Sequence, residues 1–291
     1  MPPDSVISII ESHVGASIVG FESVGGGCIS NATRLRSKSG DFFLKWSNGQ
    51  AAQTFPAEAF SLSAMHGVQS DLIIPEAILA LDASGLAPGV LLMNWIDSGS
   101  KVQDFWEVFG RGLAQMHRST DARYGFAEDN FIGRIPQENT WEDSWVTFFR
   151  EHRLESQVAL ARTNRRWQAS WDRPLDHLYA RLADVLPEKP EASILHGDLW
   201  GGNYMVERGG KPVLIDPASY HGHREADLAM TELFGGFDRR FYDAYRSTWP
   251  IEGGYDERRQ IYNLYHLINH LNHFGSGYSD SVAGILRLYS V

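Results

Sequence analysis

Residues 194–206 read ILHGDLWGGNYMV: two apolar runs separated by a short segment that carries three glycines, Asp198 and Asn203. Short apolar runs next to glycine are typical of strands joined by a tight loop. A further run, VLIDP, brings Asp216 thirteen residues after Asn203. The chain therefore has to place three oxygen-bearing side chains beside short strands, and we expect them to meet in one site.

The first ~95 residues predict the strands of one sheet, with a single helix inserted between the third and fourth strands. Runs separated by Gly, Pro and Ser give the order strand, strand, strand, helix, strand, strand. Residues 54–67 (TFPAEAFSLSAMHG) supply the helix, with a Thr cap, an early Pro and a Gly past the end. Lys45 lies in the third strand, FFLKW, and Glu58 lies in the helix.

The pattern changes after residues 97–101 (DSGSK). Trp106, Phe109, Leu113 and Met116 are spaced 3, 4 and 3 residues apart, which predicts an amphipathic helix. Residues 141–161 predict another helix, and beyond VLIDP the chain is expected to be helical to its end. A strand-rich first part followed by a mainly helical second part predicts an α+β fold. The length of 291 residues favours two lobes. Residues 1–96 would form an N-terminal lobe with an antiparallel sheet, and residues 97–291 a mainly helical C-terminal lobe.

The polar residues suit phosphoryl transfer, in which a protein mainly positions the reactants and neutralises their charge. Asp198 would orient an acceptor hydroxyl and take its proton. Asn203 and Asp216 would supply the oxygen ligands that Mg²⁺ prefers. Lys45 would reach the phosphates of ATP, with its direction set by Glu58.

A glycine turn ahead of Lys45 would let backbone N–H groups approach phosphate. The turn consists of Gly25, Gly26 and Gly27. Each feature alone has an ordinary explanation: Lys45 could lie along apolar surface, and Glu58 could be a solvated helix residue. Their joint order and spacing favour the phosphoryl-transfer interpretation.

In this order the residues resemble the protein-kinase-like fold, with a glycine loop, a strand lysine, a helix glutamate, H-x-D-x-x-x-x-N and a later metal aspartate. The glycine turn departs from the usual G-x-G-x-x-G. The resemblance implies that residues 89–97 form the hinge. Met93 would then lie behind the adenine pocket, and the Asn94 carbonyl and Ile96 N–H would pair with the adenine edge.

Two separations favour a small-molecule acceptor over a protein. About 80 residues lie between His117 and Asp198, enough for several added helices. After Asp216 the segment DPASYHGHREADLAM enters a predicted helix within about ten residues. No long segment remains on which a peptide could dock. We therefore expect the acceptor pocket between the loop that carries Asp198 and the added helices that precede it.

LHGDLWGGN, DPASYHGHRE, LFGGF and GGGCISNA together resemble the fructosamine/ketosamine kinase family, whose relatives include aminoglycoside and choline kinases. The resemblance runs from about Gly25 to the segment NHLNHFG near the end of the chain. It implies ATP-dependent phosphorylation of the 3-hydroxyl of a sugar joined to an amine, either a fructosamine or a ribulosamine. The product would eliminate and release the amine, which is deglycation. It also implies that His196 and Asp227 support the catalytic loop.

Two residues are candidates for contact with the acceptor. Trp200 could stack against a sugar or its amine, or it could be a buried structural ring. His266, His270 and His273 share one helical face. A zinc site there lacks a nearby Cys or acidic ligand, so we favour His270 as a pocket residue. The opposite stripe would pack in the core: Ile261, Leu264, Ile268 and Leu271.

The charge and composition of the chain limit the classes of partner that it can bind. The chain has 26 Lys and Arg against 36 Asp and Glu, a net charge of −10 without basic clusters, which argues against nucleic acid. The first residues lack a basic n-region and a long apolar stretch, and no apolar window is long enough for a membrane span, so we expect neither a secretory signal nor a membrane span. A single cysteine, Cys28, fits a reducing cytoplasm. We expect a monomer, with a redox-linked dimer through Cys28 as a hypothesis.

Three other functions compete with a ketosamine kinase. The first is a kinase of another amino-sugar, an aminoglycoside or a choline-like alcohol. The second is a nucleotide-binding module without catalysis, against which the intact Lys45, Asp198, Asn203 and Asp216 weigh. The third is a metal-dependent hydrolase built on the histidines.

Overall fold

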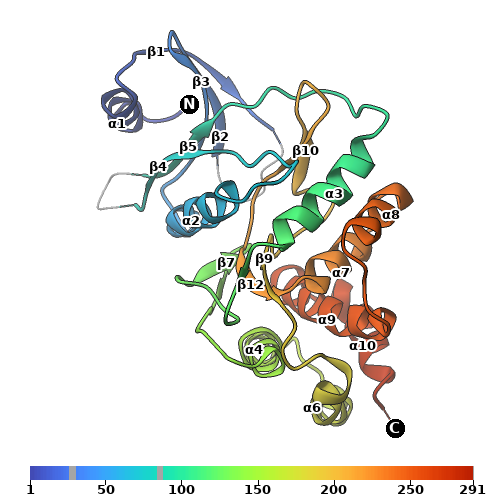
Figure 1. The fold of residues 1–291 in the computed structure, drawn as a ribbon. Coiled ribbons are helices and arrows are strands. Elements are labelled where there is room, and N and C mark those ends of the chain that lie inside the picture. Colours follow the sequence, from blue (N-terminus) through green and yellow to red (C-terminus); the bar gives the residue numbers. More distant parts are fainter. Residues whose placement is uncertain (26–30, 84–87, 291) are drawn as a thin grey trace.

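The computed structural model describes residues 1–25, 31–83 and 88–290. Figure 1 shows an N-terminal sheet with two helices beside it, followed by a larger part built mainly of helices. This arrangement confirms the predicted α+β class. The division of the chain at residue 96 stays a prediction; the sheet ends at Asn94, and the next helix begins at Phe105.

The N-terminal sheet has five strands in the order β1-β2-β3-β5-β4, and every neighbouring pair is antiparallel. The strands are β1 Ile18–Ser23, β2 Asn31–Ser37, β3 Gly40–Ser47, β4 Ala77–Leu81 and β5 Gly89–Asn94, and helix α2 spans Phe55–His66. The predicted order of these elements is confirmed. Thr54 occupies the predicted N-cap position of α2, but its side chain makes no capping hydrogen bond, because a 3₁₀ turn precedes α2 and the Thr54 hydroxyl donates back to the Ala51 carbonyl at 2.9 Å.

A second helix in this part, α1 (Asp4–Val14), was not predicted. Its signal is present in the sequence: Val6 and Ile10 share one face, and Gly15 closes the helix with a φ of 66°. The two apolar side chains cover one face of the sheet, where they pack against Leu35, Leu44, Val90 and Leu92. Because side chains alternate along a strand, Lys45 then faces the opposite side, toward α2.

The remaining chain contains eight α-helical segments in the described residues and several short strands. The helices are α3 Phe105–His117, α4 Trp145–Phe148, α5 Ser156–Thr163, α6 Asp172–Val185, α7 Glu225–Leu233, α8 Arg239–Thr248, α9 Tyr255–Phe274 and α10 Ser279–Arg287, with a π-helical turn Phe149–Glu155 between α4 and α5. The strands are β6 Thr120–Asp121, β7 Asn130–Ile132, β8 Ile135–Gln137, β9 Ala192–Leu195, β10 Tyr204–Val206, β11 Pro212–Leu214 and β12 Tyr220–His223.

Strand β12 corrects the expectation of an entirely helical end. It pairs antiparallel with β9, with Tyr220 opposite Leu195. Its sequence, YHGH, has little strand propensity, so the pairing rather than the local pattern defines it. The predicted helix at 141–161 also starts later, at Trp145, because the Ser144 side chain accepts a hydrogen bond from the Thr147 N–H at 3.1 Å.

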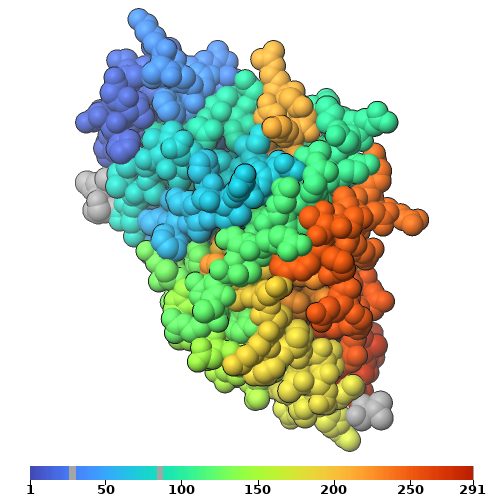
Figure 2. Space-filling model, viewed as in Figure 1, coloured from blue at the N-terminus to red at the C-terminus, as the bar shows by residue number. Residues whose placement is uncertain are grey.

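One apolar core runs through both parts of the molecule and includes Phe55 and Met93 as well as Leu199 and Ile268. The predicted stripe of α9 is fully buried in this core: Ile261, Leu264, Ile268 and Leu271. The β10–β11 hairpin (light orange) rises against the N-terminal part in Figure 2. The Ile73 N–H donates to the Pro212 carbonyl at 3.0 Å, which attaches the hairpin there. Within the described residues, no helix combines the length and the apolar character that a membrane span requires.

Several histidines are buried, and their burial predicts a pH-dependent stability. Burial lowers the pKa of His117 and His223, and it lowers the pKa of His266 to about 3. In the unfolded chain these residues bind protons below pH ~6.5. The unfolded state therefore takes up more protons, and we expect the free energy of unfolding to fall below that pH by about 1.4 kcal/mol per pH unit for each extra proton.

Urea unfolding between pH 7.5 and 5 measures this slope. His266→Asn should reduce the slope by up to about 1.4 kcal/mol per pH unit, which is the contribution of one proton. His13→Asn, a change at an exposed residue of α1, is the control and should leave the slope unchanged. Identical slopes in wild type and His266→Asn would contradict the expectation for this histidine.

Candidate active site

The loop between β9 and β10 carries Asp198, and we call residues 196–203 the catalytic loop. Gly197 has a φ of 83°, and a Cβ there would lie 2.0 Å from the Ala218 carbonyl oxygen. Only glycine fits this position, for reasons of both conformation and space. The Ala218 N–H donates to the His196 carbonyl at 2.9 Å. The catalytic loop is therefore packed against the segment that follows Asp216.

Asp227, in the first turn of α7, holds the start of the catalytic loop. Its buried carboxylate accepts hydrogen bonds from the His196 N–H at 2.7 Å and the Gly197 N–H at 2.9 Å. His117 Nε2 lies 3.1 Å from the same carboxylate, and its Nδ1 lies 2.8 Å from the Tyr245 hydroxyl. Burial alone would raise the pKa of Asp227, but the hydrogen bonds from His117 and the backbone outweigh it and lower that pKa. The carboxylate therefore stays ionised.

His117 belongs to this network, and sequence reasoning did not assign it a role. It lies at the end of α3, 110 residues before Asp227, and it is completely buried. The only local signal is a histidine in the last turn of an amphipathic helix, which is an ordinary feature. The His196 side chain supports the same loop, because its Nδ1 accepts a hydrogen bond from the Asp198 N–H at 3.2 Å.

Asn203 faces Asp198 across the catalytic loop. The Asn203 Nδ2 donates to the Asp198 carbonyl at 2.7 Å and to its Oδ2 at 2.9 Å. This orientation directs the nitrogen of the amide toward Asp198 and leaves its oxygen on the other side. Although Asp198 is only half-buried by surface area, the surrounding protein raises its pKa to about 8, against the opposing effect of the Asn203 hydrogen bond. The carboxylate is thus a stronger base than in water.

Lys45, Glu58 and Asp216 meet although they lie far apart in the sequence. The Lys45 Nζ lies 2.7 Å from Glu58 Oε1 and 2.6 Å from Asp216 Oδ1. Burial would lower the pKa of Lys45, but the two carboxylates raise it above its ordinary value. The lysine is therefore a permanent cation that joins the N-terminal sheet to the segment after β11.

Asp216 has a φ of 55°, in the left-handed region that aspartate tolerates better than most residues. Its side chain remains 50% exposed despite the ion pair. The Ile215 N–H donates to the Asn203 carbonyl at 3.1 Å, which keeps the two candidate ligands close in the backbone. A carboxylate and an amide oxygen are suitable donors for Mg²⁺, so Asn203 and Asp216 could hold one.

Two buried side-chain amides hold the segment that follows Asp216. The sequence pattern did not identify either of them as a site residue. The Asn130 Nδ2 donates to the Ser219 carbonyl at 2.7 Å, and the Gln137 Nε2 donates to the Ala218 carbonyl at 3.2 Å. Gln137 in turn accepts a hydrogen bond from the Tyr265 hydroxyl. The β7–β8 hairpin therefore sets the position of the chain that packs against Gly197.

The residues predicted to contact nucleotide are described only in part. Gly25, two residues after the end of β1, is exposed, whereas Gly26, Gly27 and Cys28 lie outside the described residues. Met93 is buried in the sheet opposite Phe43.

Asn94 ends β5, and its Oδ1 accepts the Glu76 N–H at 2.7 Å, which fixes the end of the strand. Ile96 follows and is half-buried. The adenine contacts assigned to Met93, Asn94 and Ile96 stay predictions.

Trp200 and His270 lie on one surface. Trp200 is 40% exposed, whereas the structural alternative required a buried ring. Its ring is 6.3 Å from that of Phe234, and the Phe234 ring is 4.8 Å from that of His270. Sequence reasoning assigned no role to Phe234 beyond the motif LFGGF. Contact of any of these residues with an acceptor stays a prediction.

The histidines of α9 do not form a metal site. Within the part of the chain that the structure describes, the one group of three acidic or histidine side chains close enough to share an ion is Glu142, Glu151 and His152. The His152 Nε2 already lies 3.4 Å from Glu142 Oε1, within hydrogen-bond distance. The hydrolase alternative built on the α9 histidines therefore has no structural support.

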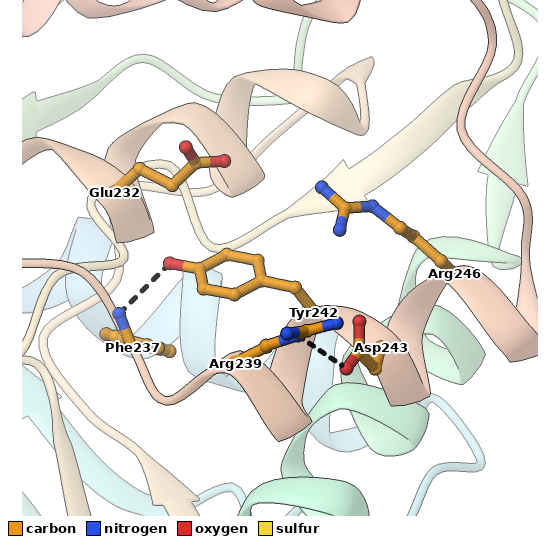
Figure 3. Close-up of a pocket in the computed structure, with 6 residues that line it drawn as sticks. All are labelled: Glu232, Phe237, Arg239, Tyr242, Asp243 and Arg246. Atoms are coloured by element: carbon orange, nitrogen blue, oxygen red, sulfur yellow. Dashed lines mark hydrogen bonds and ion pairs between the residues drawn. The ribbon is translucent and has the colours of Figure 1, made fainter.

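A surface pocket of about 480 Å³ lies between the end of α7 and α8 (Figure 3). It is lined by Glu232, Phe237, Arg239, Tyr242, Asp243 and Arg246. Several of its polar groups are already engaged, since Arg239 pairs with Asp243 at 3.3 Å and Glu232 accepts from Tyr255 at 2.7 Å. None of the predicted site residues lines this pocket, and we assign it no role.

Comparisons with known proteins agree over nearly the whole chain. The family model described as fructosamine kinase matches residues 3–289. A protein of Synechocystis sp., provisionally named a ketoamine kinase, is 40% identical over 91% of this chain and 88% of its own length. The chloroplastic protein-ribulosamine 3-kinase of Arabidopsis thaliana is 37% identical over 97% of this chain and 86% of its own.

Solved structures show the same relationship. A crystal structure from Thermobifida fusca, provisionally named a fructosamine-3-kinase, superposes with a TM-score of 0.88 at 27% identity and covers 98% of each chain. A thermostable mutant of an aminoglycoside phosphotransferase, solved with AMP-PNP and hygromycin B, gives a TM-score of 0.63 at 14% identity over 97% of this chain and 96% of its own. That second likeness shows the shared fold alone. By the family model and by these relatives, the chain belongs to the fructosamine kinase family.

Proposed function

We propose that this protein is an ATP-dependent kinase that phosphorylates the sugar 3-hydroxyl of ketosamines. The observation that carries the proposal is the arrangement around Lys45, which is ion-paired with both Glu58 and Asp216. Membership of the fructosamine kinase family supports the same acceptor class. Relatives named ketoamine kinase and ribulosamine 3-kinase are 40% and 37% identical to this chain.

Each residue has a role that its surroundings suit. Asp198 orients the 3-hydroxyl and accepts its proton as the oxygen attacks the terminal phosphate, a task for which a pKa of about 8 is better than that of an exposed carboxylate. Lys45 neutralises charge on the α- and β-phosphates, and Glu58 holds the lysine in that direction. Asp227 and His196 keep the catalytic loop in place.

Asn203 and Asp216 would hold Mg²⁺. The ion, when bound, neutralises charge on the phosphate oxygens. The adenine would lie against Met93, with its edge at the Asn94 carbonyl and the Ile96 N–H.

The N–H groups of the glycine turn would contact the phosphates: Gly25, Gly26 and Gly27. The lobe boundary at residue 96 and a redox-linked dimer through Cys28 also stay predictions.

The reaction would serve deglycation. A phosphate ester at the 3-position is a better leaving group than a hydroxyl, so the phosphorylated ketosamine eliminates phosphate more readily. Water then hydrolyses the imine that remains, and the amine is released. The net charge of −10 is compatible with a cationic acceptor.

A coupled assay of ADP release with four acceptors tests the proposal: a fructosyl-amine, a ribulosyl-amine, kanamycin and choline. We expect turnover with one or both ketosamines and none above background with kanamycin or choline. Turnover of kanamycin or choline alone would replace the proposed acceptor. Binding of Mg-ATP without turnover of any acceptor would favour the non-catalytic module.

A further inference from the structure

Exposed aromatic rings gather beside the catalytic loop. In the described part of the chain, four phenylalanine or tryptophan side chains are exposed, and three of them come from this region: Trp200 at 40%, Phe234 at 40% and Phe274 at 69%. They come from three separate segments, and half-buried rings of α9 and the following turn join them. We call this surface the aromatic strip, and it consists of Trp200, Phe234, His270, Phe274 and Tyr278.

The turn LFGGF holds Phe234 in the strip. Gly235 and Gly236 have φ values of 99° and 72°, and a Cβ on Gly235 would meet no atom within 4 Å. Conformation rather than space therefore requires glycine there. The turn separates the two phenylalanines: the Phe237 ring packs 5.0 Å from that of Phe241, and its N–H donates to the Tyr242 hydroxyl at 3.0 Å (Figure 3). Phe234 is left at the surface beside Trp200.

The strip continues along the end of α9 without introducing a charge. The His270 ring lies 5.5 Å from that of Phe274 and 5.1 Å from that of Tyr278. Its Nδ1 donates to the His266 carbonyl at 2.8 Å. Burial lowers the pKa of His270 below its ordinary value, so the ring is neutral at pH 7. The strip thus begins two residues from Asp198 and ends at Phe274 as a series of neutral π faces.

We propose, on the basis of the proposed function, that the aromatic strip receives the amine side of the ketosamine while the sugar hydroxyl lies at Asp198. The nitrogen of a ketosamine is a basic amine that carries a proton near neutral pH, and aromatic faces attract such cations. The hydrocarbon attached to that nitrogen gains by covering exposed rings. The occupant is therefore the alkyl chain of the amine, such as that of a glycated lysine side chain.

Because the rings follow one another along the surface, the aromatic strip should discriminate between ketosamines by the length of the alkyl chain on the nitrogen. A ketosamine of a short amine would reach Trp200 and Phe234, next to the catalytic loop. A longer alkyl chain would extend to His270, Phe274 and Tyr278. Phe274 then contributes to the KM of long-chain ketosamines and not to that of short-chain ones, and it has no part in the chemical step.

Two ketosamines with the same sugar test the strip, one made from methylamine and one from hexylamine. We expect wild type to show the lower KM for the hexylamine adduct. Phe274→Ala should raise that KM roughly tenfold while leaving kcat and the KM of the methylamine adduct unchanged. Phe274→Leu, which keeps hydrocarbon but lacks a π face, should give a smaller increase. Leu288→Ala, at a residue 61% exposed after α10, is the matched control and should change neither constant.

The outcomes separate the two proposals. Turnover of both adducts with equal KM values, or an equal KM change for both in Phe274→Ala, would overturn the role of the strip and leave the kinase reaction intact. Failure of wild type to phosphorylate either adduct would overturn both the proposed function and the strip. Because Phe274 is largely exposed, its truncation should not change the thermal midpoint, and circular dichroism verifies that the variants are folded.

Discussion

Asp198→Asn is expected to lower kcat by roughly 10² to 10⁴-fold, the usual contribution of a positioned base, while the affinity for nucleotide is largely kept. Asparagine has the shape of aspartate and can still face Asn203, so the catalytic loop should be preserved. It cannot accept the proton of the acceptor hydroxyl. The measurement is kcat with a ketosamine that wild type phosphorylates, together with the Kd for a non-hydrolysable ATP analogue.

Asp184→Asn supplies the control for this change, because it makes the same substitution at an exposed position of α6. It should alter neither kcat nor the Kd. If Asp198→Asn retained the wild-type kcat, Asp198 would lose its assigned role as the base. If Asp198→Asn lost nucleotide affinity as well as kcat, Asp198 would instead be needed to maintain the structure of the site.

Asp227→Ala should lower the free energy of unfolding by about 3 kcal/mol or more, because three buried donors lose their acceptor and each unsatisfied buried polar group costs about 1–3 kcal/mol. The change leaves the His196 and Gly197 N–H groups and the His117 ring without the carboxylate that now accepts from them. None of these groups is placed to find water instead, because His117 and His196 are completely buried.

Urea unfolding at pH 7.5 measures this effect. Asp227→Asn keeps one acceptor oxygen and should cost less than the alanine change, and Asp184→Ala on the surface of α6 should cost little. A loss below 1 kcal/mol for Asp227→Ala would mean that the catalytic loop is held mainly by other contacts. The contacts at Gly197 and along β12 would then be the ones to test.

Much of the fold could be predicted because its signals are local. The five strands and α2 follow from short runs separated by turn residues, and α3 follows from its helical spacing. Lys45, Asp198, Asn203 and Asp216 stood out because each follows or lies in such a run. Helix α1 has an equally local signal in Val6, Ile10 and Gly15.

Other elements had no local signal. β12 exists as a strand because it pairs with β9, and nothing in YHGH predicts that pairing. His117 reaches Asp227 across 110 residues, and Asn130 reaches the Ser219 carbonyl across 89. A buried amide or histidine of this kind looks like any polar residue in the sequence, because its function depends on a partner that folding brings close.

The sequence by itself determined the fold class and the order of the elements from β1 to β5 with α2, and it predicted the polar residues of the candidate site, since spacing along the chain records these directly. Only the tertiary structure decided that Asp216 also pairs with Lys45, that His117 lies against Asp227, and that Trp200, Phe234 and His270 share one surface. The physical reason is that packing and hydrogen bonding act over a few ångströms in space, whereas the residues they join lie tens to hundreds of positions apart in the chain.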